Sequence, residues 1–152
     1  MYNNGLEVIF NGIFAAIVAQ VLKLIGYVIK HKKFNFKILT TTGGMPSSHS
    51  AGVIGLATTA GLIEGFTSVT FAIALGYSLV VMYDAAGVRR SAGKIAAVLN
   101  RIKEDIYSHK PELIGDKLKE LLGHTPFEVF VGALLGIGIA YLNHYVFSIF
   151  YI

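Results

Sequence analysis

The sequence predicts an all-α fold, a polytopic bundle of about four transmembrane helices with two amphipathic helices on the cytoplasmic side. Three observations predict it. Hydrophobic residues make up 54% of the 152-residue chain, charged residues make up 14%, and the mean hydropathy is +0.62, which is far more apolar than a soluble domain. Several apolar runs are long enough to cross a bilayer. All thirteen Lys and Arg residues lie within Lys23–Lys37 or Arg89–Lys119.

The first apolar run, Leu6–Ile29, is long enough to cross with some tilt. It lacks a convincing small-residue cleavage site, so we expect a mature span. Lys23 lies within two turns of the basic segment that follows, which leaves two orientations open. Its stem either carries the ammonium to the surface or turns it inward toward a ligand. Gln20, one turn earlier, favours a polar inward face.

The second and third spans are expected at about Pro46–Ile63 and Phe66–Met82. The connection between them is so short that the two helices must be antiparallel neighbours. Small residues on both runs allow their backbones to approach closely. We therefore expect the glycines of the chain to serve mainly helix packing. The small residues are Ala51, Gly52, Gly55, Ala57 and Gly61 on the second run and Ala72, Ala74 and Gly76 on the third.

A polar region separates the third span from Gly123 and contains two sets of apolar residues at helical spacing. Pro111 divides the two sets. We predict two amphipathic helices on the membrane surface, with a small soluble helical hairpin as the alternative. The first set is Ile95, Val98, Leu99, Ile102 and Ile106, and the second is Ile114, Leu118, Leu121 and Leu122.

The last span is expected from Thr125 to about Phe150. Its start, Thr125-Pro126-Phe127-Glu128, has the form of a capping box with proline at the first helical position. Gly132 and Gly136 have a Gly-x-x-x-Gly spacing, which is compatible with a homodimer. No repeat or linker divides the chain, so residues 1–152 are expected to form one integral membrane domain.

Charge distribution predicts the topology. Both basic regions should be cytoplasmic by the positive-inside rule, because the short second connection carries only Glu64 and the N-terminus only Glu7. Both termini should then lie outside. This arrangement brings three motifs to one face of the membrane, at the ends of different spans: residues 43–50, Arg89-Arg90 and residues 124–128.

The motif Gly43-Gly44-Met45-Pro46-Ser47-Ser48-His49-Ser50 lies between two long apolar runs. Pro46 suits the first turn of a helix, and the two glycines permit a tight turn before it. A helix N-terminus has unsatisfied N–H groups and partial positive charge, so this motif is expected to form an anion site. The alternative is that Pro-Ser-Ser only starts a helix.

The gathered residues suit phosphate chemistry. Arg89, Arg90, Lys23 and two helix N-termini supply positive charge and donors for phosphate. His49 and His124 add two imidazoles, one to attack phosphorus and the other to protonate the leaving oxygen. Glu128, four residues after His124, is placed to hold its N–H. Each has a simpler alternative: the arginines as headgroup anchors, His124 as a polar residue before the helix, Glu128 as the capping-box acid alone.

Neither a metal nor another cofactor is expected. The chain has no cysteine, which excludes disulfides and thiolate metal sites. Near the motifs the only carboxylates expected are those of Asp84 and Glu128, too few for a clamp of two metal ions.

Met45-Pro46-Ser47-Ser48-His49 resembles the Pro-Ser-Gly-His motif of the type 2 phosphatidic acid phosphatase and vanadium-dependent haloperoxidase superfamily. Together, residues 43–51, 83–93 and 122–132 resemble its small divergent bacterial branch. The resemblance implies that His49 is the general acid, His124 the nucleophile and Glu128 its orienting acid in place of aspartate. It implies a phosphate contact from Arg89 or Arg90. From the residues themselves, Lys23, Gly44, Ser47 and Ser48 are predicted as further substrate-binding residues.

The sequence departs from that superfamily in three ways. The Lys-x6-Arg-Pro motif is absent, the third motif is split between Arg90 and His124, and four spans replace six. The predicted function is a metal-independent phosphatase of membrane lipid phosphates that works through a phosphohistidine. The expected partners are the membrane and an anionic phospholipid or polyprenyl phosphate, with no nucleic acid. The alternative is a non-catalytic lipid-binding or lipid-transport protein that retains the phosphate pocket.

Overall fold

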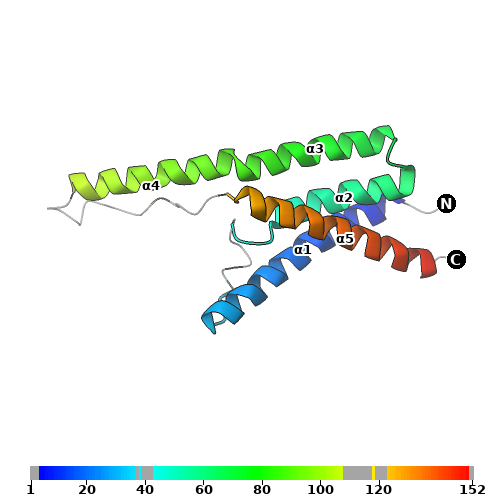
Figure 1. Cartoon of the computed structure of the whole chain (residues 1–152), viewed down its shortest axis with the longest axis horizontal. Coiled ribbons are helices and arrows are strands. Elements are labelled where there is room, and N and C mark those ends of the chain that lie inside the picture. The colour runs from blue at the N-terminus through cyan, green and yellow to red at the C-terminus, as the bar shows by residue number, and fades with distance from the viewer. Residues whose placement is uncertain (1–3, 37, 39–42, 108–117, 119–122, 151–152) are drawn as a thin grey trace.

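The computed structural model describes residues 4–36, 38, 43–107, 118 and 123–150, and within that part no strand occurs. Figure 1 shows the helices as an elongated bundle. The predicted all-α fold is confirmed. The helices are α1 (Asn4–His31), α2 (Ser48–Glu64), α3 (Val69–Ala86), α4 (Val88–Ile106) and α5 (Pro126–Phe150).

Three helices in the described part are long and apolar enough to cross a membrane: α1, α3 with its continuation into α4, and α5. The polytopic bundle is thus confirmed, but the second predicted span is shorter than expected. With 17 residues, α2 is about 26 Å long, just short of a hydrocarbon core of ~30 Å. The reason lies at its start, where Ser47 is the N-cap and its Oγ accepts the Ser50 N–H at 3.4 Å. Pro46 precedes the helix, so its predicted place in the first turn is wrong.

The short helix α2 is the centre of the bundle and packs against α1, α3 and α5. Its closest neighbour is α5, because Gly132 and Gly136 lie directly against the backbone of α2. A Cβ at these glycines would collide with the carbonyl oxygens of Ser47 and Ala51. The Gly-x-x-x-Gly spacing therefore serves packing within the chain, and the homodimer stays a prediction.

Gly52 and Gly55 of α2 face α1 rather than α3, whereas an added Cβ on Gly61 would meet Phe66 and, on α3, Phe71. A Cβ on Gly52 would lie 3.2 Å from the Gly12 carbonyl oxygen, and one on Gly55 would lie 3.2 Å from Ala15 Cβ. Gly76 of α3 has nothing within 4 Å of an added Cβ. The predicted close approach of α2 to α3 through small residues is thus wrong for these positions. A hydrogen bond from Ser78 Oγ to the Val53 carbonyl oxygen, at 2.9 Å, joins these two helices.

A buried polar network joins α1, α2 and α5. Asn11 is fully buried and donates to Thr59 Oγ1 at 3.0 Å, and Asn143 donates to Asn11 Oδ1 at 2.8 Å. One turn farther toward the chain terminus, His144 Nδ1 lies 2.8 Å from Glu7 Oε1. Because polar groups inside a membrane protein need partners, these contacts fix how α1 and α5 pair.

Replacing Asn11 by Leu should lower the stability of the bundle, because Asn143 and Thr59 lose a buried partner. We expect a loss of about 1–3 kcal/mol in the free energy of unfolding, measured by thermal unfolding in detergent. Ile13→Leu, two residues along α1 and exposed, is the control. Equal stability of the Asn11 variant and the control would show that the network contributes nothing.

Helix α4 continues the line of α3 past Gly87 and extends beyond the bundle (Figure 1). It is amphipathic as predicted and projects from α3 in the same direction. Its placement on the membrane surface stays a prediction. The buried Asn100 exchanges two hydrogen bonds of 2.9 Å with the backbone of Leu118, so the returning chain passes beside α4 at that point. The second predicted amphipathic helix otherwise lies outside the described residues.

The arrangement of helix ends agrees with the prediction. Figure 1 shows the first residues of α2 and α5 and the junction of α3 and α4 at one end of the bundle. The N- and C-terminal ends of the chain lie together at the other end. The fold thereby brings the three sequence motifs to one place.

Candidate active site

The centre of the candidate site is a buried His–Glu pair at the start of α5. His124 Nδ1 lies 3.0 Å from Glu128 Oε2, and their side chains are 3% and 21% exposed. The contact that the four-residue spacing predicted is present. Because Nδ1 faces the carboxylate, the other ring nitrogen is the one available for chemistry. His124 Nε2 is buried and has no hydrogen-bond partner among the described residues.

A capping box and one hydrogen bond between backbone groups hold this pair in place. Glu128 forms the predicted capping box: its N–H donates to Thr125 Oγ1 and its carboxylate accepts the Thr125 N–H, both at 3.3 Å. The His124 N–H donates to the Ala85 carbonyl oxygen at 2.9 Å. The second contact ties the site to the last turn of α3, and no motif in the sequence signalled it.

The start of α2 lies against the same pair. The Ser47 N–H donates to the Glu128 carbonyl oxygen at 3.1 Å, and Ser47 Oγ is the cap of α2 and also accepts from Ser50 Oγ at 3.1 Å. Ser47 is thus engaged in holding the turn. The imidazole of His49 is half-buried, and its ring centre is 6.3 Å from that of His124. The two histidines that the sequence predicted to act together are therefore neighbours.

Lys23 turns inward. Its side chain is 7% exposed, and its Nζ is buried without a hydrogen-bond partner in the described part of the chain. The stem packs over Gly44, where an added Cβ would lie 3.5 Å from Lys23 Cδ. The ammonium interacts electrostatically with Glu128. Of the two orientations left open by the sequence, the structure has the one that directs Lys23 to the site.

Glycines let the loops of the site approach one another. Gly43, Gly44 and Gly123 all have positive φ angles, of 148°, 80° and 86°, a region that side chains disfavour. A Cβ on Gly43 would lie 3.4 Å from the Gly123 carbonyl oxygen. The loop before α2 therefore runs next to the loop before α5.

The two predicted arginines are described by their backbone alone. The backbone of Arg89 and Arg90 forms the first turn of α4, directly after the last turn of α3 that holds His124. Their side chains lie outside the described residues. In the described part of the chain no group of three or more His, Cys, Asp or Glu side chains is placed to hold a metal ion.

Fold and site together define a helical membrane protein with a His–Glu pair, a second histidine and a buried lysine at one end of its bundle. The chain matches the model of the Divergent PAP2 family over residues 4–139 and belongs to that family. The motifs had predicted this relationship to a phosphatase superfamily. The chain is 41% identical over 143 residues to "Uncharacterized membrane protein YuiD" from Bacillus subtilis (strain 168), across 88% of this chain and 90% of the relative. No solved structure gives a significant match.

Proposed function

We propose that this protein is a phosphatase of membrane lipid phosphates that acts through a phosphohistidine on His124. The observation that carries the proposal is the state of that imidazole: Glu128 holds Nδ1 at 3.0 Å, while the buried Nε2 has no partner among the described residues. This is the arrangement of an activated nucleophile whose tautomer is set by a third group. Family membership supports a phosphatase-related chemistry.

In the first step, Nε2 of His124 attacks phosphorus and the bond from phosphorus to the lipid oxygen breaks. His49, whose ring centre is 6.3 Å away, donates a proton to the leaving oxygen, so that the lipid alcohol departs neutral. The Glu128 carboxylate stabilises the positive charge that develops on the His124 ring. In the second step, neutral His49 takes a proton from a water molecule as that water attacks phosphorus, and inorganic phosphate leaves with Nε2 restored.

Phosphate charge is balanced by groups at the same end of the bundle. Lys23 supplies a buried cation with no hydrogen-bond partner in the described part, and burying a charge without a partner is costly. An anionic ligand would offset that cost. The first turn of α2, which begins at Ser48, is the positive end of that helix's dipole. The backbone of Arg89 and Arg90 follows directly on the last turn of α3.

The direct test is release of inorganic phosphate by the purified protein from a mixture of phosphatidic acid, phosphatidylglycerophosphate and polyprenyl phosphate, with chelator present. We expect turnover of at least one lipid. Binding of these lipids without phosphate release would replace the enzyme by the alternative, a lipid-binding or lipid-transport protein.

We also propose that the site faces the cytoplasm, because all thirteen Lys and Arg residues lie within 23–37 or 89–119, the stretches of sequence that adjoin the site motifs. The chain contains no cysteine, so single cysteines report topology cleanly. A cysteine replacing the exposed Glu64 should react with an impermeant thiol reagent applied to intact cells, and one replacing Lys33 should react only after lysis. The reverse labelling would place the site on the outer face.

A further inference from the structure

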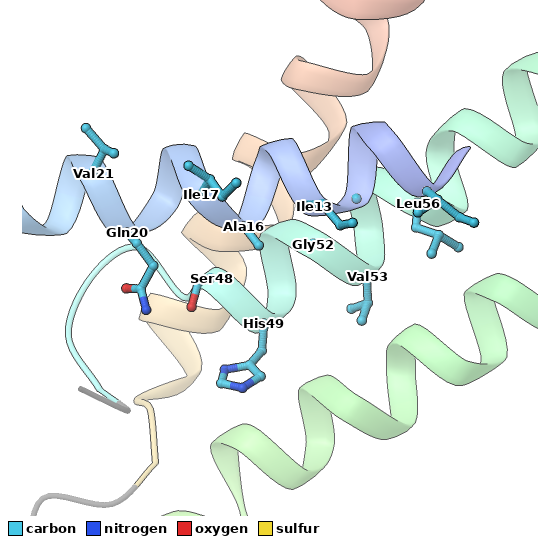
Figure 2. A pocket seen from close by; sticks show the side chains of 12 residues that line it. Ile13, Ala16, Ile17, Gln20, Val21, Ser48, His49, Gly52, Val53 and Leu56 are labelled. Carbon is cyan, nitrogen blue, oxygen red and sulfur yellow. The ribbon is translucent and has the colours of Figure 1, made fainter. Parts of the chain in front are cut away.

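A groove between α1 and α2 begins at the candidate site and continues along the bundle. Its volume is about 750 Å³, within the ~300–1,000 Å³ of typical ligand pockets. Figure 2 shows Gln20, Ser48 and His49 at one end of it. Beyond these three polar side chains the lining is entirely apolar. The groove thus has one polar end, which it shares with the site.

The shape of the groove follows from helix packing. Its floor is narrow because α1 and α2 touch through glycine: a Cβ on Gly12 would lie 3.2 Å from the Gly52 carbonyl oxygen. Ile13 and Ile17, which are 57% and 54% exposed, form one wall. Leu56 lies on the α2 side (Figure 2). Larger side chains thus stand on both sides of a line of small residues, and the space between them accommodates a single flexible chain.

The length of the groove matches a lipid chain. Along α1 it extends from Ile9 to Val21, which is about 18 Å at ~1.5 Å per residue. One leaflet of the hydrocarbon core is about 15 Å thick, half of ~30 Å. A hydrocarbon chain that starts at His49 would therefore be accommodated along most of its length.

We propose that this groove binds one hydrocarbon chain of the substrate, with the phosphate of the same molecule between His49 and His124. The inference rests on the proposed function and adds the substrate class: phosphate esters of long-chain lipids, held by one chain. Continuity identifies the occupant, because Ser48 and His49 line the groove and also begin α2 at the site. An unrelated lipid would leave the polar end unused.

Photolabelling tests where the chain lies. The probe is hexadecyl phosphonate with a diazirine at mid-chain, which the enzyme cannot hydrolyse because its phosphorus is bonded to carbon. With wild-type protein in phosphatidylcholine vesicles, we expect label on Ile9–Val21 of α1 and Gly52–Leu56 of α2. Unlabelled phosphonate should displace it, whereas hexadecanol should not. Label spread over the exposed faces of α3 and α5, without displacement by phosphonate, would overturn the proposal.

A matched pair of variants gives a kinetic test. Ile17→Trp fills the groove, and Ile73→Trp places the same ring on the exposed face of α3, where Ile73 is 68% exposed. For Ile17→Trp we expect the ratio of kcat/KM for hexadecyl phosphate to that for an aryl phosphate to fall about tenfold, with no change for Ile73→Trp. An unchanged ratio in both variants would contradict binding of the hydrocarbon chain in the groove.

These outcomes separate the two proposals. Hydrolysis of an aryl phosphate combined with dispersed label would support the phosphatase activity and exclude chain binding in the groove. Displaceable label in the groove combined with no hydrolysis of any phosphate would retain the lipid site and remove the phosphatase.

Discussion

Replacing His124 by Asn should abolish phosphatase turnover, with a fall in kcat of roughly 10⁴-fold or more. Asn can still face Glu128, which lies 3.0 Å from the Nδ1 that it replaces, but it has no atom in the place of Nε2. The nucleophile is therefore removed while the turn is kept. Lipid binding should persist, because phosphate charge is met mainly by cations and helix ends. Phosphate release and binding of a lipid phosphonate are the two measurements.

The control for this prediction is a second histidine–glutamate pair of the same chain. His144 near the other end of α5 also pairs with a glutamate, Glu7, at 2.8 Å, so His144→Asn removes a comparable pair outside the site. It should leave kcat within about threefold of wild type, because side chains away from the reacting atoms seldom affect the chemical step. Turnover by the His124 variant, or equal losses in the two variants, would exclude His124 as nucleophile.

The same mechanism predicts the response to inhibitors. Vanadate should inhibit by occupying the phosphate site in the trigonal-bipyramidal geometry of the transition state, and a chelator should have no effect on the rate. Activity that vanished with chelator and returned with magnesium would redirect attention to Asp84 and Glu128 as metal ligands.

Replacing Lys23 by Met should lower kcat/KM about 10²- to 10³-fold, the usual loss when one group that stabilises transition-state charge is removed. Met keeps most of the stem that packs over Gly44 but lacks the ammonium. Stability should move in the opposite direction, or stay unchanged, because the variant no longer buries a cation without a hydrogen-bond partner in the described part.

Two measurements together make the Lys23 prediction specific. Phosphate release gives the activity and thermal unfolding gives the stability, with Lys30→Met, an exposed position in the last turn of α1, as the control. Lower stability together with lower activity in the Lys23 variant would indicate a structural lysine. Full activity would remove Lys23 from the site.

Local signals in the sequence predicted much of this site. The capping box at Thr125–Glu128 specified both the start of α5 and the spacing that brings Glu128 to His124. Charge asymmetry predicted that residues 43–50 and 124–128 share one end of the bundle, because each basic region had to lie on the same side. These inferences succeeded because the physics is local or depends only on the order of the spans.

Other features depend on which helix faces meet, and neither the composition nor the periodicity of the sequence specifies that. Gly52 and Gly55 were assigned to contacts with α3 but pack on α1, since a small residue allows close approach without choosing the partner. Asn11 is a polar residue in the first apolar run, but nothing in the sequence identifies Thr59 and Asn143 as its partners. Pro46 lies outside α2 for a different reason: the helix is capped by Ser47, and Pro46 comes before that cap instead of after it.

The contacts of α5 also set the order in which the site is assembled during biosynthesis. This helix supplies Glu128 and Asn143, His124 lies just before it, and the ribosome makes it after α1 and α2. Until it inserts, Lys23 lacks its carboxylate neighbour and Asn11 lacks one of its two hydrogen bonds in the bilayer. A nascent chain that has inserted only its first helices thus carries polar groups that hydrocarbon solvates poorly. Completion of the proposed phosphate site and relief of that membrane cost are therefore one event, and we expect an incompletely inserted chain to be inactive.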